Sequence, residues 1–582
     1  MHLAIHHARQ LTVALLLWLV AFEAAAAVPI SVEVKGISGA LRENVLAHLS
    51  LAHHKDDSDL SEAGMRLLLR RAPKEVQTAL RPFGYYEASV ATSLKRTESK
   101  WLAEIDIKPG RQVRIDKVDV RVDGVGKSDP AFSTLVEKLP LKVGDSLNDA
   151  EYEKFKESLQ NVAAERGYFD AKLTRHEIAV DPVRHRAEIY LYIDTGPRYL
   201  FGPVRFEQSQ LDPDLLRRYV DFKQGEPFDS AKLVELQSAL VDSDYFQLVT
   251  VSPKRDEAVD REVPIVITLT PRKPNKYTFG IGYGTDTGPR GSAGWERRWV
   301  NRRGHRVKLN AKVSQIGDSY TASYIVPMAH PRTDQLVYSA GYDDETTDTA
   351  RSRITKYGVS YTHRRGSWTE TWGLSYQQEA YTVGTDQGRS TLLVPSVLWS
   401  RVHADNRVYP RHGNSVSLLL RGAADSVLSD TSFTQTRLDA KLIGTAGDNA
   451  RWIARTSLGY SWVPEFSTLP ASMRFFAGGD RSVRGYGYNT LGPTDATGQV
   501  IGGDYLVVGS LEYEHTIRGR LGAAVFYDVG NALDDLSGPL ERGAGVGLRW
   551  RSPVGPIRLD VASALSREGQ PWRIHISIGP DL

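Results

Sequence analysis

The chain of 582 residues carries 73 basic and 70 acidic side chains and has a mean hydropathy of -0.34. The near balance of charge excludes a strongly basic nucleic-acid-binding protein, so we expect no nucleic-acid partner. Cysteine is absent, which excludes disulfides and leaves burial and strand pairing to hold the fold. The length indicates several domains.

The first residues predict a secretory signal peptide. A weakly basic start precedes an apolar run over residues 11–22, and Ala25 and Ala27 occupy the small-residue positions of a cleavage site, so we expect residues 1–27 to be removed. The alternative is an uncleaved membrane anchor, but about a dozen apolar residues fall short of the ~20 that a spanning helix needs. Since no later apolar run is as long, the mature chain is either soluble or crosses a membrane as strands.

Three segments that follow resemble one another. They read "RPFGYYEASV", "AERGYFDAKL" and "VDSDYFQLVTV", and their aromatic pairs are Tyr85/Tyr86, Tyr168/Phe169 and Tyr245/Phe246. Each pair comes after a helix-like stretch and before two alternating strands. We therefore predict three modules, each a small sheet with helices on one face, over residues 28–109, 110–196 and 197–273.

This repeat resembles POTRA domains, the polypeptide-transport-associated modules. The resemblance implies that the modules bind client chains through an exposed strand edge, because an unpaired edge can accept a further strand. The sequence does not show which edge is free. The alternative is three generic α+β domains that share a fold and no common role.

Beyond residue 274 apolar and polar residues alternate at period two, as in "RVKLNAKVS" (306–314), where charge fills the polar face. This suits lipid outside and a wet lumen inside, whereas a soluble sandwich, the alternative, would turn its apolar face inward. Residues 274–582 accommodate about 16 strands at roughly 10 residues each plus loops. Open edges are costly in a lipid bilayer, so the sheet must close. The predicted fold is α+β POTRA repeats followed by an all-β transmembrane barrel of about 16 antiparallel strands.

One connection is too long to be ordinary. From roughly Glu465 to Gly503 the chain does not alternate and is rich in Gly, Asp, Asn and Pro, and Arg484 lies near its middle. Alternation in the two following strands turns Glu512 and Asp528 toward the lumen. An arginine folded inward would bond either carboxylate, and the alternative is an exposed loop whose arginine only aids solubility.

The motifs around this arginine resemble the outer-membrane barrel assembly superfamily. The matching stretches are "SVRGYGYNTLGP", "GSLEYE", "FYDVGN" and "GVGLRWRSPVGPIRLD". The stretch "RVHADNRVYPRHGNSV" (401–416) also resembles the D-x-R, P-x-x-G segment of that superfamily. In that superfamily the tip of the sixth extracellular loop enters the barrel, and its arginine pairs with the acidic residue of an F-x-D-x-G motif. The resemblance carries the tip over to Val483, Arg484, Gly485 and Tyr486. It carries the F-x-D-x-G motif to Phe526, Asp528 and Gly530, with Glu512 as the second acceptor.

Within the superfamily the chain resembles the TamA family, because it has three POTRA-like modules, "SPVGPIRLD" and the ending "IGPDL". That resemblance implies an outer-membrane protein with periplasmic modules that inserts or secretes clients such as autotransporters. It also implies a TamB-like partner, anchored in the inner membrane, that docks on the first module. We find no metal-spaced cluster, nucleophile elbow or phosphate loop, so we expect neither a cofactor nor an enzyme.

The barrel is expected to close between its first strand, near residues 276–286, and its last, near "WRIHISIGPDL". Glycines 280, 282 and 284 in the first strand permit bending, and alternation turns Ile574, Ile576 and Ile578 of the last strand toward lipid. A client strand would pair with the opened edge and pass into the bilayer. Alternatively these glycines only shape the barrel.

Two other functions remain open: a two-partner-type secretion pore, and a protein that bridges the envelope layers in TamB-dependent lipid transport.

Overall fold

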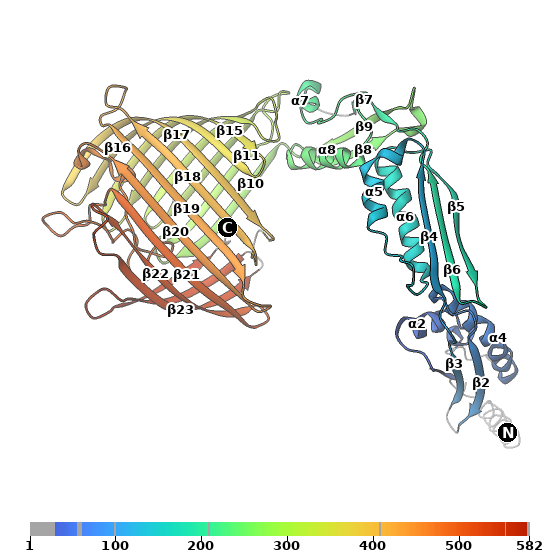
Figure 1. Cartoon of the computed structure of the whole chain (residues 1–582). Helices are drawn as coiled ribbons and strands as arrows, with labels where there is room; N and C mark the ends of the chain where they lie inside the picture. Colours follow the sequence, from blue (N-terminus) through green and yellow to red (C-terminus); the bar gives the residue numbers. More distant parts are fainter. Residues whose placement is uncertain are drawn as a thin grey trace, which may run out of the picture. The chain divides into compact units, whose positions relative to one another are not determined.

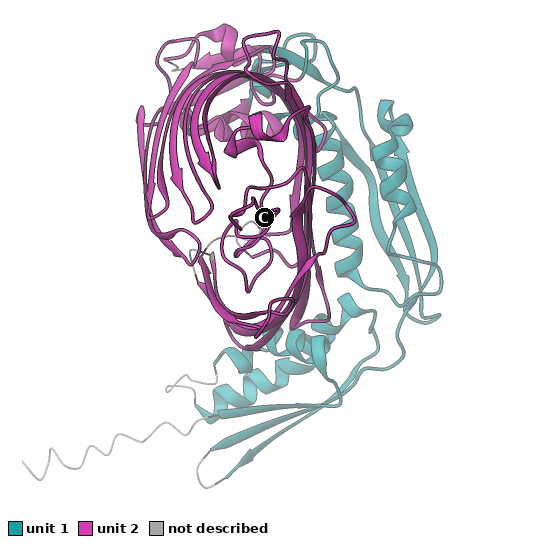
Figure 2. Cartoon of the chain, turned by 90° about the vertical axis from the view of Figure 1, so that its left-hand side faces the viewer, with its two compact units in different colours: residues 1–203, 222–233, 253–265 teal, residues 204–221, 234–252, 266–582 magenta. Residues whose placement is uncertain are grey.

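The computed structural model describes residues 30–54, 61–97, 100–207, 210–406, 409–552 and 555–578 (Figure 1). The predicted signal peptide and the final "GPDL" lie outside these ranges. The chain divides into two compact units, coloured separately in Figure 2. Every helix in the described ranges is too short or too polar to cross a membrane.

The N-terminal part consists of three modules that repeat the order strand, helices, strand, strand. The first contains β1 (Ile30–Lys35), α2 (Gly39–His48), α3 (Ser50–His53), α4 (Glu62–Leu80), η1 (Arg81–Phe83), β2 (Ser89–Arg96) and β3 (Trp101–Lys108). The second contains β4 (Arg114–Asp123), η2 (Val125–Ser128), α5 (Pro130–Glu137), α6 (Asp149–Glu165), β5 (Lys172–Asp181) and β6 (Arg186–Asp194). The third contains β7 (Leu200–Glu207), α7 (Pro213–Arg217), α8 (Ser230–Asp242), β8 (Phe246–Pro253), η3 (Arg255–Glu257) and β9 (Glu262–Pro271). Their sheets have the orders β1-β3-β2, β4-β6-β5 and β7-β9-β8, which confirms the predicted α+β repeat.

Local sequence explains the helices of these modules. Helix α6 begins where the Asn148 side chain accepts a hydrogen bond from the Ala150 amide (3.1 Å), an N-cap that satisfies one otherwise unpaired N–H. Tyr152, Phe155 and Leu159 follow at helical spacing and are buried. Each such side chain contributes about 1.5–3 kcal/mol on burial, so the helix is held by its apolar face.

The repeated aromatic pairs lie where one module meets the next segment. Tyr86 packs against the core of the second module, and the Phe169 ring lies 5.0 Å from that of Phe228 in the third. In the third pair the Tyr245 hydroxyl donates to the Gly304 carbonyl (2.5 Å), between strands β11 (Gly288–Arg297) and β12 (Arg306–Ser314) of the barrel. The pairs therefore repeat because each one makes a junction.

The C-terminal part is one antiparallel sheet of 16 strands in sequential order (Figure 1). Its strands are β10 (Asn275–Gly284), β11 (Gly288–Arg297), β12 (Arg306–Ser314), β13 (Gly317–Pro327), β14 (Gln335–Thr346), β15 (Ala350–Arg365), β16 (Trp368–Val383), β17 (Asp386–Ala404), β18 (Gly413–Ala423), β19 (Phe433–Thr445), β20 (Ala450–Trp462), β21 (Tyr505–Arg518), β22 (Leu521–Leu533), β23 (Glu541–Ser552), β24 (Gly555–Ala564) and β25 (Trp572–Ile578). They form a ring (Figure 2, magenta), which confirms the predicted barrel.

The period-two alternation sets the two faces of this barrel. On β21, Leu511 is 59% exposed whereas Glu512 is 6% exposed. On β25, Ile574 is 55% exposed and His575 only 2%. Apolar side chains thus face outward and polar side chains face the lumen, as a barrel in lipid requires.

Candidate functional site: loop six in the barrel lumen

Residues 463–504 form the long connection between β20 and β21, called loop six below. The predicted loop, roughly Glu465 to Gly503, differs from it by two residues at one end and one at the other. Its short helices are η4 (Phe466–Thr468) and η5 (Ala471–Met473). The buried Arg474 side chain donates to the carbonyls of Leu469 (2.8 Å) and Ile501 (3.2 Å) and to Asp386 of β17 (3.0 Å), so it ties both ends of the loop to the wall.

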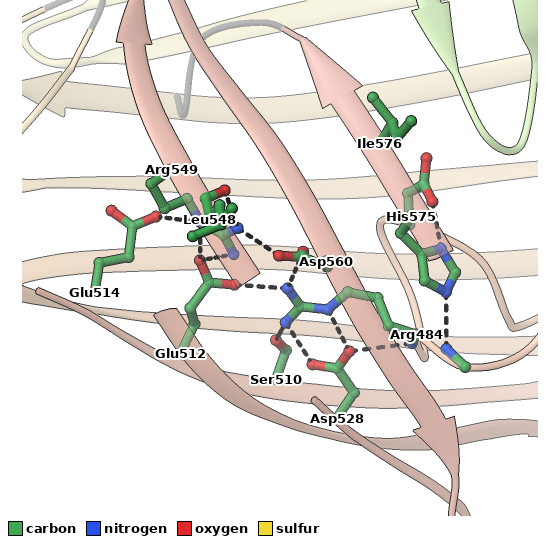
Figure 3. A network of polar contacts seen from close by, with 12 residues as sticks. Arg484, Ser510, Glu512, Glu514, Asp528, Leu548, Arg549, Asp560, His575 and Ile576 are labelled. Carbon is green, nitrogen blue, oxygen red and sulfur yellow. Dashed lines mark hydrogen bonds and ion pairs between the residues drawn. The ribbon is translucent and has the colours of Figure 1, made fainter. Parts of the chain in front are cut away.

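Arg484 lies in the lumen with 3% of its surface exposed (Figure 3). Its Nε and Nη2 atoms donate to the two oxygens of Asp528 at 2.7 and 3.0 Å, and its backbone amide donates to the same carboxylate at 3.1 Å. Nη1 donates to Glu512 at 2.7 Å and to Asp560 at 3.0 Å. Paired, parallel N–H bonds to a carboxylate are among the strongest and most direction-dependent polar contacts in proteins.

The F-x-D-x-G motif explains this geometry. Phe526 and Asp528 are two residues apart on β22, so both face the lumen. Asp528 accepts hydrogen bonds along one edge of the Arg484 guanidinium. The Phe526 ring lies against the face of the guanidinium, with the ring centroid 3.4 Å from Cζ. At Gly530 a Cβ would lie 2.4 Å from the Val507 carbonyl oxygen of the neighbouring strand, so that position has no room for a side chain.

A second arginine extends the cluster. Arg549 of β23 donates to Glu512 (2.7 Å), to Glu514 (3.0 Å) and to Asp560. We call Arg484, Ser510, Glu512, Glu514, Asp528, Arg549 and Asp560 the luminal charge cluster. The alternation that turns Glu512 inward also turns Glu514 inward, and the alternation of "GVGLRWR" carries the same signal for Arg549, which sequence reasoning missed.

Beside this cluster lies the segment that resembles the D-x-R, P-x-x-G pattern. Arg451 donates to Glu514 (2.6 Å) and to the Pro410 carbonyl (2.7 Å), and its guanidinium lies 3.6 Å from the centroid of the Tyr409 ring. The arginine of that pattern, residue 407, lies outside the described residues. The two family-like stretches thus meet at one charged surface.

Glycine makes room for the loop tip. A Cβ at Gly543 of β23 would lie 1.9 Å from the Arg484 carbonyl oxygen. Gly485 has φ +97°, in the left-handed region that favours glycine, and a Cβ there would lie 2.8 Å from the backbone of Ser563. Val483 and Tyr486 are both buried, and the Tyr486 hydroxyl donates to Glu541 of β23 (2.7 Å).

The seam between β10 and β25 is sparsely bonded. Within the described residues β10 has strand pairing only with β11, and β25 only with β24. In the turn after β10, the Thr285 amide donates to the Ile576 carbonyl (3.2 Å), and the Ile576 amide donates to the Thr285 hydroxyl (2.8 Å). The Arg290 guanidinium also reaches the Ile578 carbonyl (3.4 Å).

The predicted seam residues occupy these two strands. A Cβ at Gly280 would lie 2.6 Å from the Ser292 hydroxyl, and one at Gly282 would lie 2.9 Å from Arg290 Nε, so polar side chains of β11 occupy that space. Gly284 ends β10, with the Ile576 carbonyl 3.8 Å from where its Cβ would be. The outward residues of β25 pair with residues of β24: Ile574 with Val561, Ile576 with Leu559 and Ile578 with Ile557.

Comparison with known families agrees with this architecture. The Omp85 superfamily domain matches residues 300–581. Most of the barrel is thus similar to this domain. The model "POTRA domain TamA domain 1" matches residues 31–109, and the POTRA model "Surface antigen variable number repeat" matches residues 119–196 and 199–272. The barrel lies in the outer membrane and the POTRA domains lie in the periplasm.

The chain is similar to proteins called outer membrane protein assembly factor BamA. It is 23% identical to the one from Nitratidesulfovibrio vulgaris, over 88% of this chain and 68% of the relative, and 22% identical to the one from Neisseria meningitidis serogroup B, over 83% and 69%. Among solved structures, BamA from Haemophilus ducreyi lacking POTRA domains 1-3 matches with a TM-score of 0.67 and 19% identity, over 80% of this chain and 99% of that chain. At that identity the likeness shows the fold.

Proposed function

We propose that this chain is an outer-membrane assembly factor that inserts or secretes client outer-membrane proteins, autotransporters among them. The observation that carries the proposal is the seam, where β10 has a strand edge that is unpaired within the described residues. An unpaired edge accepts a further strand, and a client strand that pairs there is already positioned beside lipid. Similarity to relatives named as assembly factors supports this role.

The TamA type is the form of this function that we propose. It is supported by the match of residues 31–109 to the first TamA POTRA domain and by the number of modules. The first module would dock a TamB-like, periplasm-spanning partner. Its sheet has two outer strands, β1 and β2, each paired on one side only, and these edges suit the addition of an extended segment.

The luminal charge cluster holds loop six in place in this mechanism. Arg484 binds strands β21, β22 and β24, so loop six is held by the wall next to β25, across the seam from the free edge of β10. The seam can then open by breaking few hydrogen bonds while the loop stays attached. The new strand–strand bonds and the burial of the client in lipid drive insertion, so the step needs no nucleotide.

A reversible crosslink across the seam tests the proposal. The chain has no cysteine, so Thr285→Cys with Ile576→Cys introduces one pair, and the hydrogen bonds between these residues place their backbones at a distance suited to a disulfide. Client assembly in cells should stop when the pair is oxidised and resume on reduction. A matched pair on β11 and β12, Ala293→Cys with Ala311→Cys, should not affect assembly because those strands stay paired.

The other outcomes separate the rival functions. If oxidised protein still exports a client and deletion of loop six opens a large conductance, the chain is a secretion pore. If oxidation has no effect but deletion of the first module abolishes the phenotype, the chain bridges the envelope layers for lipid transport. Either result contradicts lateral insertion through the seam.

A further inference from the structure

Three polar side chains from distant parts of the chain meet where the barrel closes. Asp286 lies in the turn between β10 and β11, Asp480 in loop six, and His575 on β25. The Asp480 amide donates to Asp286 Oδ2 (2.6 Å), and Asp480 Oδ1 lies 2.5 Å from His575 Nδ1. The cluster therefore connects the first strand hairpin, the loop and the last strand.

The backbone of the arginine motif fixes the state of this histidine. The Gly485 amide, which can only donate, lies 2.9 Å from His575 Nε2, so Nε2 must accept. The neutral ring then carries its proton on Nδ1 and donates it to Asp480. Figure 3 shows His575 beside Arg484, with a dashed contact at each nitrogen of its ring.

A metal ion is the other arrangement that these residues could support, since their ligand atoms all lie within 4.8 Å of one another. The hydrogen bonds oppose it. A metal on Nδ1 of a neutral ring would place the proton on Nε2, which faces the Gly485 N–H and would lose that bond. The geometry thus fits a hydrogen-bonded link better than a metal site.

We propose that Asp286, Asp480 and His575, which we call the seam clasp, are positioning residues that hold the first and last strands together through loop six. The clasp shares the peptide unit Arg484–Gly485 with the luminal charge cluster, so movement of the loop tip and opening of the seam are coupled. This inference rests on the proposed function, because a clasp of this kind matters only where the seam opens.

The test measures the seam itself, without a client. Spin labels on Ile281→Cys and Trp572→Cys report the distance between β10 and β25 in lipid nanodiscs, since both side chains are exposed and the protein has no other cysteine. His575→Ala and Asp480→Ala should each increase the ratio of open to closed seam about fivefold, the factor expected for one hydrogen bond. The double variant should open no further, because the two residues act through one link.

Two controls distinguish the clasp from general loosening of the barrel. His575→Gln, whose amide can both donate to Asp480 and accept from Gly485, should keep the closed distance. His363→Ala removes a similar histidine contact with Asp334 (2.8 Å) away from the seam and should leave the distance unchanged. If His575→Ala does not insert into membranes, Asp286→Ala removes the link to the first hairpin from a turn and should open the seam to the same extent.

An unchanged distance distribution in the three alanine variants would overturn the inference. So would a wild-type distance that shifts with zinc or EDTA, because that would make the cluster a metal site. If the clasp variants open the seam but the oxidised seam crosslink leaves client assembly intact, the clasp stands and the proposed function fails.

Discussion

The barrel wall from β21 to β24 lies next to the seam between β25 and β10. The two regions differ in how many polar bonds stabilise them. In the wall, Asp528 is fully buried, and the Arg484 side chain bonds three strands at once. At the seam, the described residues share the two hydrogen bonds between Thr285 and Ile576 and a long contact from Arg290. The protein concentrates its polar bonds where loop six must stay and leaves few where strands must separate.

This contrast shows how one sheet can be stable and still open. A buried ion pair adds little net stability, but removing one partner leaves an uncompensated charge and is costly. The charge cluster therefore fixes the position of the loop. The seam depends on few hydrogen bonds, of about 1 kcal/mol each where both partners are neutral, which thermal fluctuation can break.

Removal of one wall carboxylate should produce the largest effect. Asp528→Ala leaves Arg484 buried without its main partner and should destabilise the barrel by about 3–5 kcal/mol, seen as a lower temperature of heat modification on gels. Asp439→Ala is the matched control, because its ion pair with Arg437 is exposed to the lumen and should cost about 1 kcal/mol or less. Equal losses in the two variants would contradict the special role of the wall.

A side chain at Gly543 should displace the loop tip. Its Cβ would lie 1.9 Å from the Arg484 carbonyl oxygen, so Gly543→Ala should cost about 1–3 kcal/mol by overpacking and expose Arg484 to trypsin. Gly509→Ala on the outer face is the control, since its Cβ would be 3.6 Å from Val529. Protection of Arg484 in Gly543→Ala would show that the loop is not wedged against β23.

Amide hydrogen exchange should show that the seam is less stable than the rest of the barrel. Amides of β10 and β25 should exchange faster than those of β16, which is paired along its length on both sides. Thr285→Val removes the acceptor of the Ile576 amide and should speed exchange in β25 by about fivefold while leaving β16 unchanged. Uniform protection around the barrel would remove the contrast between wall and seam.

The smallest effect concerns pH at the first hairpin. Burial raises the pKa of the Asp286 carboxyl to about 6, and the charge of Asp480 adds to the rise, while His575 and Arg573 oppose it. Because the folded-state pKa lies above the ordinary value, the charged form carries a penalty at neutral pH that fades as the pH falls through about 6. Asp286→Asn removes this penalty. At about pH 7.5 it should therefore raise the free energy of seam opening by about 1 kcal/mol, a value reduced for solvent screening.

The comparison that isolates Asp286 is the difference between Asp286→Asn and wild type, because every other residue is the same in both. Measured with the same spin labels, this difference should shrink as the pH falls through about 6 and approach zero below about pH 3, where Asp286 is protonated whether the seam is closed or open. A difference between Asp286→Asn and wild type that grows as the pH falls would contradict this prediction.

Much of the fold was predictable because its periods are local. Alternation sets the two faces of each barrel strand, and the number of residues after 274 fixes the number of strands. Arg484, Asp528 and Glu512 could be named for the same reason, since period two alone turns both carboxylates inward and the motif supplies the arginine.

The rest depends on register between strands far apart in sequence, which periodicity does not supply. Arg549 and Asp560 join the cluster because β23 and β24 align them with Glu512, and Asp286 meets His575 only when the sheet closes. Periodicity also does not show why residue 543 must be glycine. The reason is that the Arg484 carbonyl packs against this position in the folded barrel.

The central claim is that Arg484 and Asp528 act as one unit in fixing loop six to the wall. A double-mutant cycle tests it most directly, with heat-modifiable stability and client assembly measured for Arg484→Ala, Asp528→Ala and the pair. The account predicts that each single variant impairs both properties and that the double variant is no worse than either. Losses that simply add, or a silent Arg484→Ala, would contradict it.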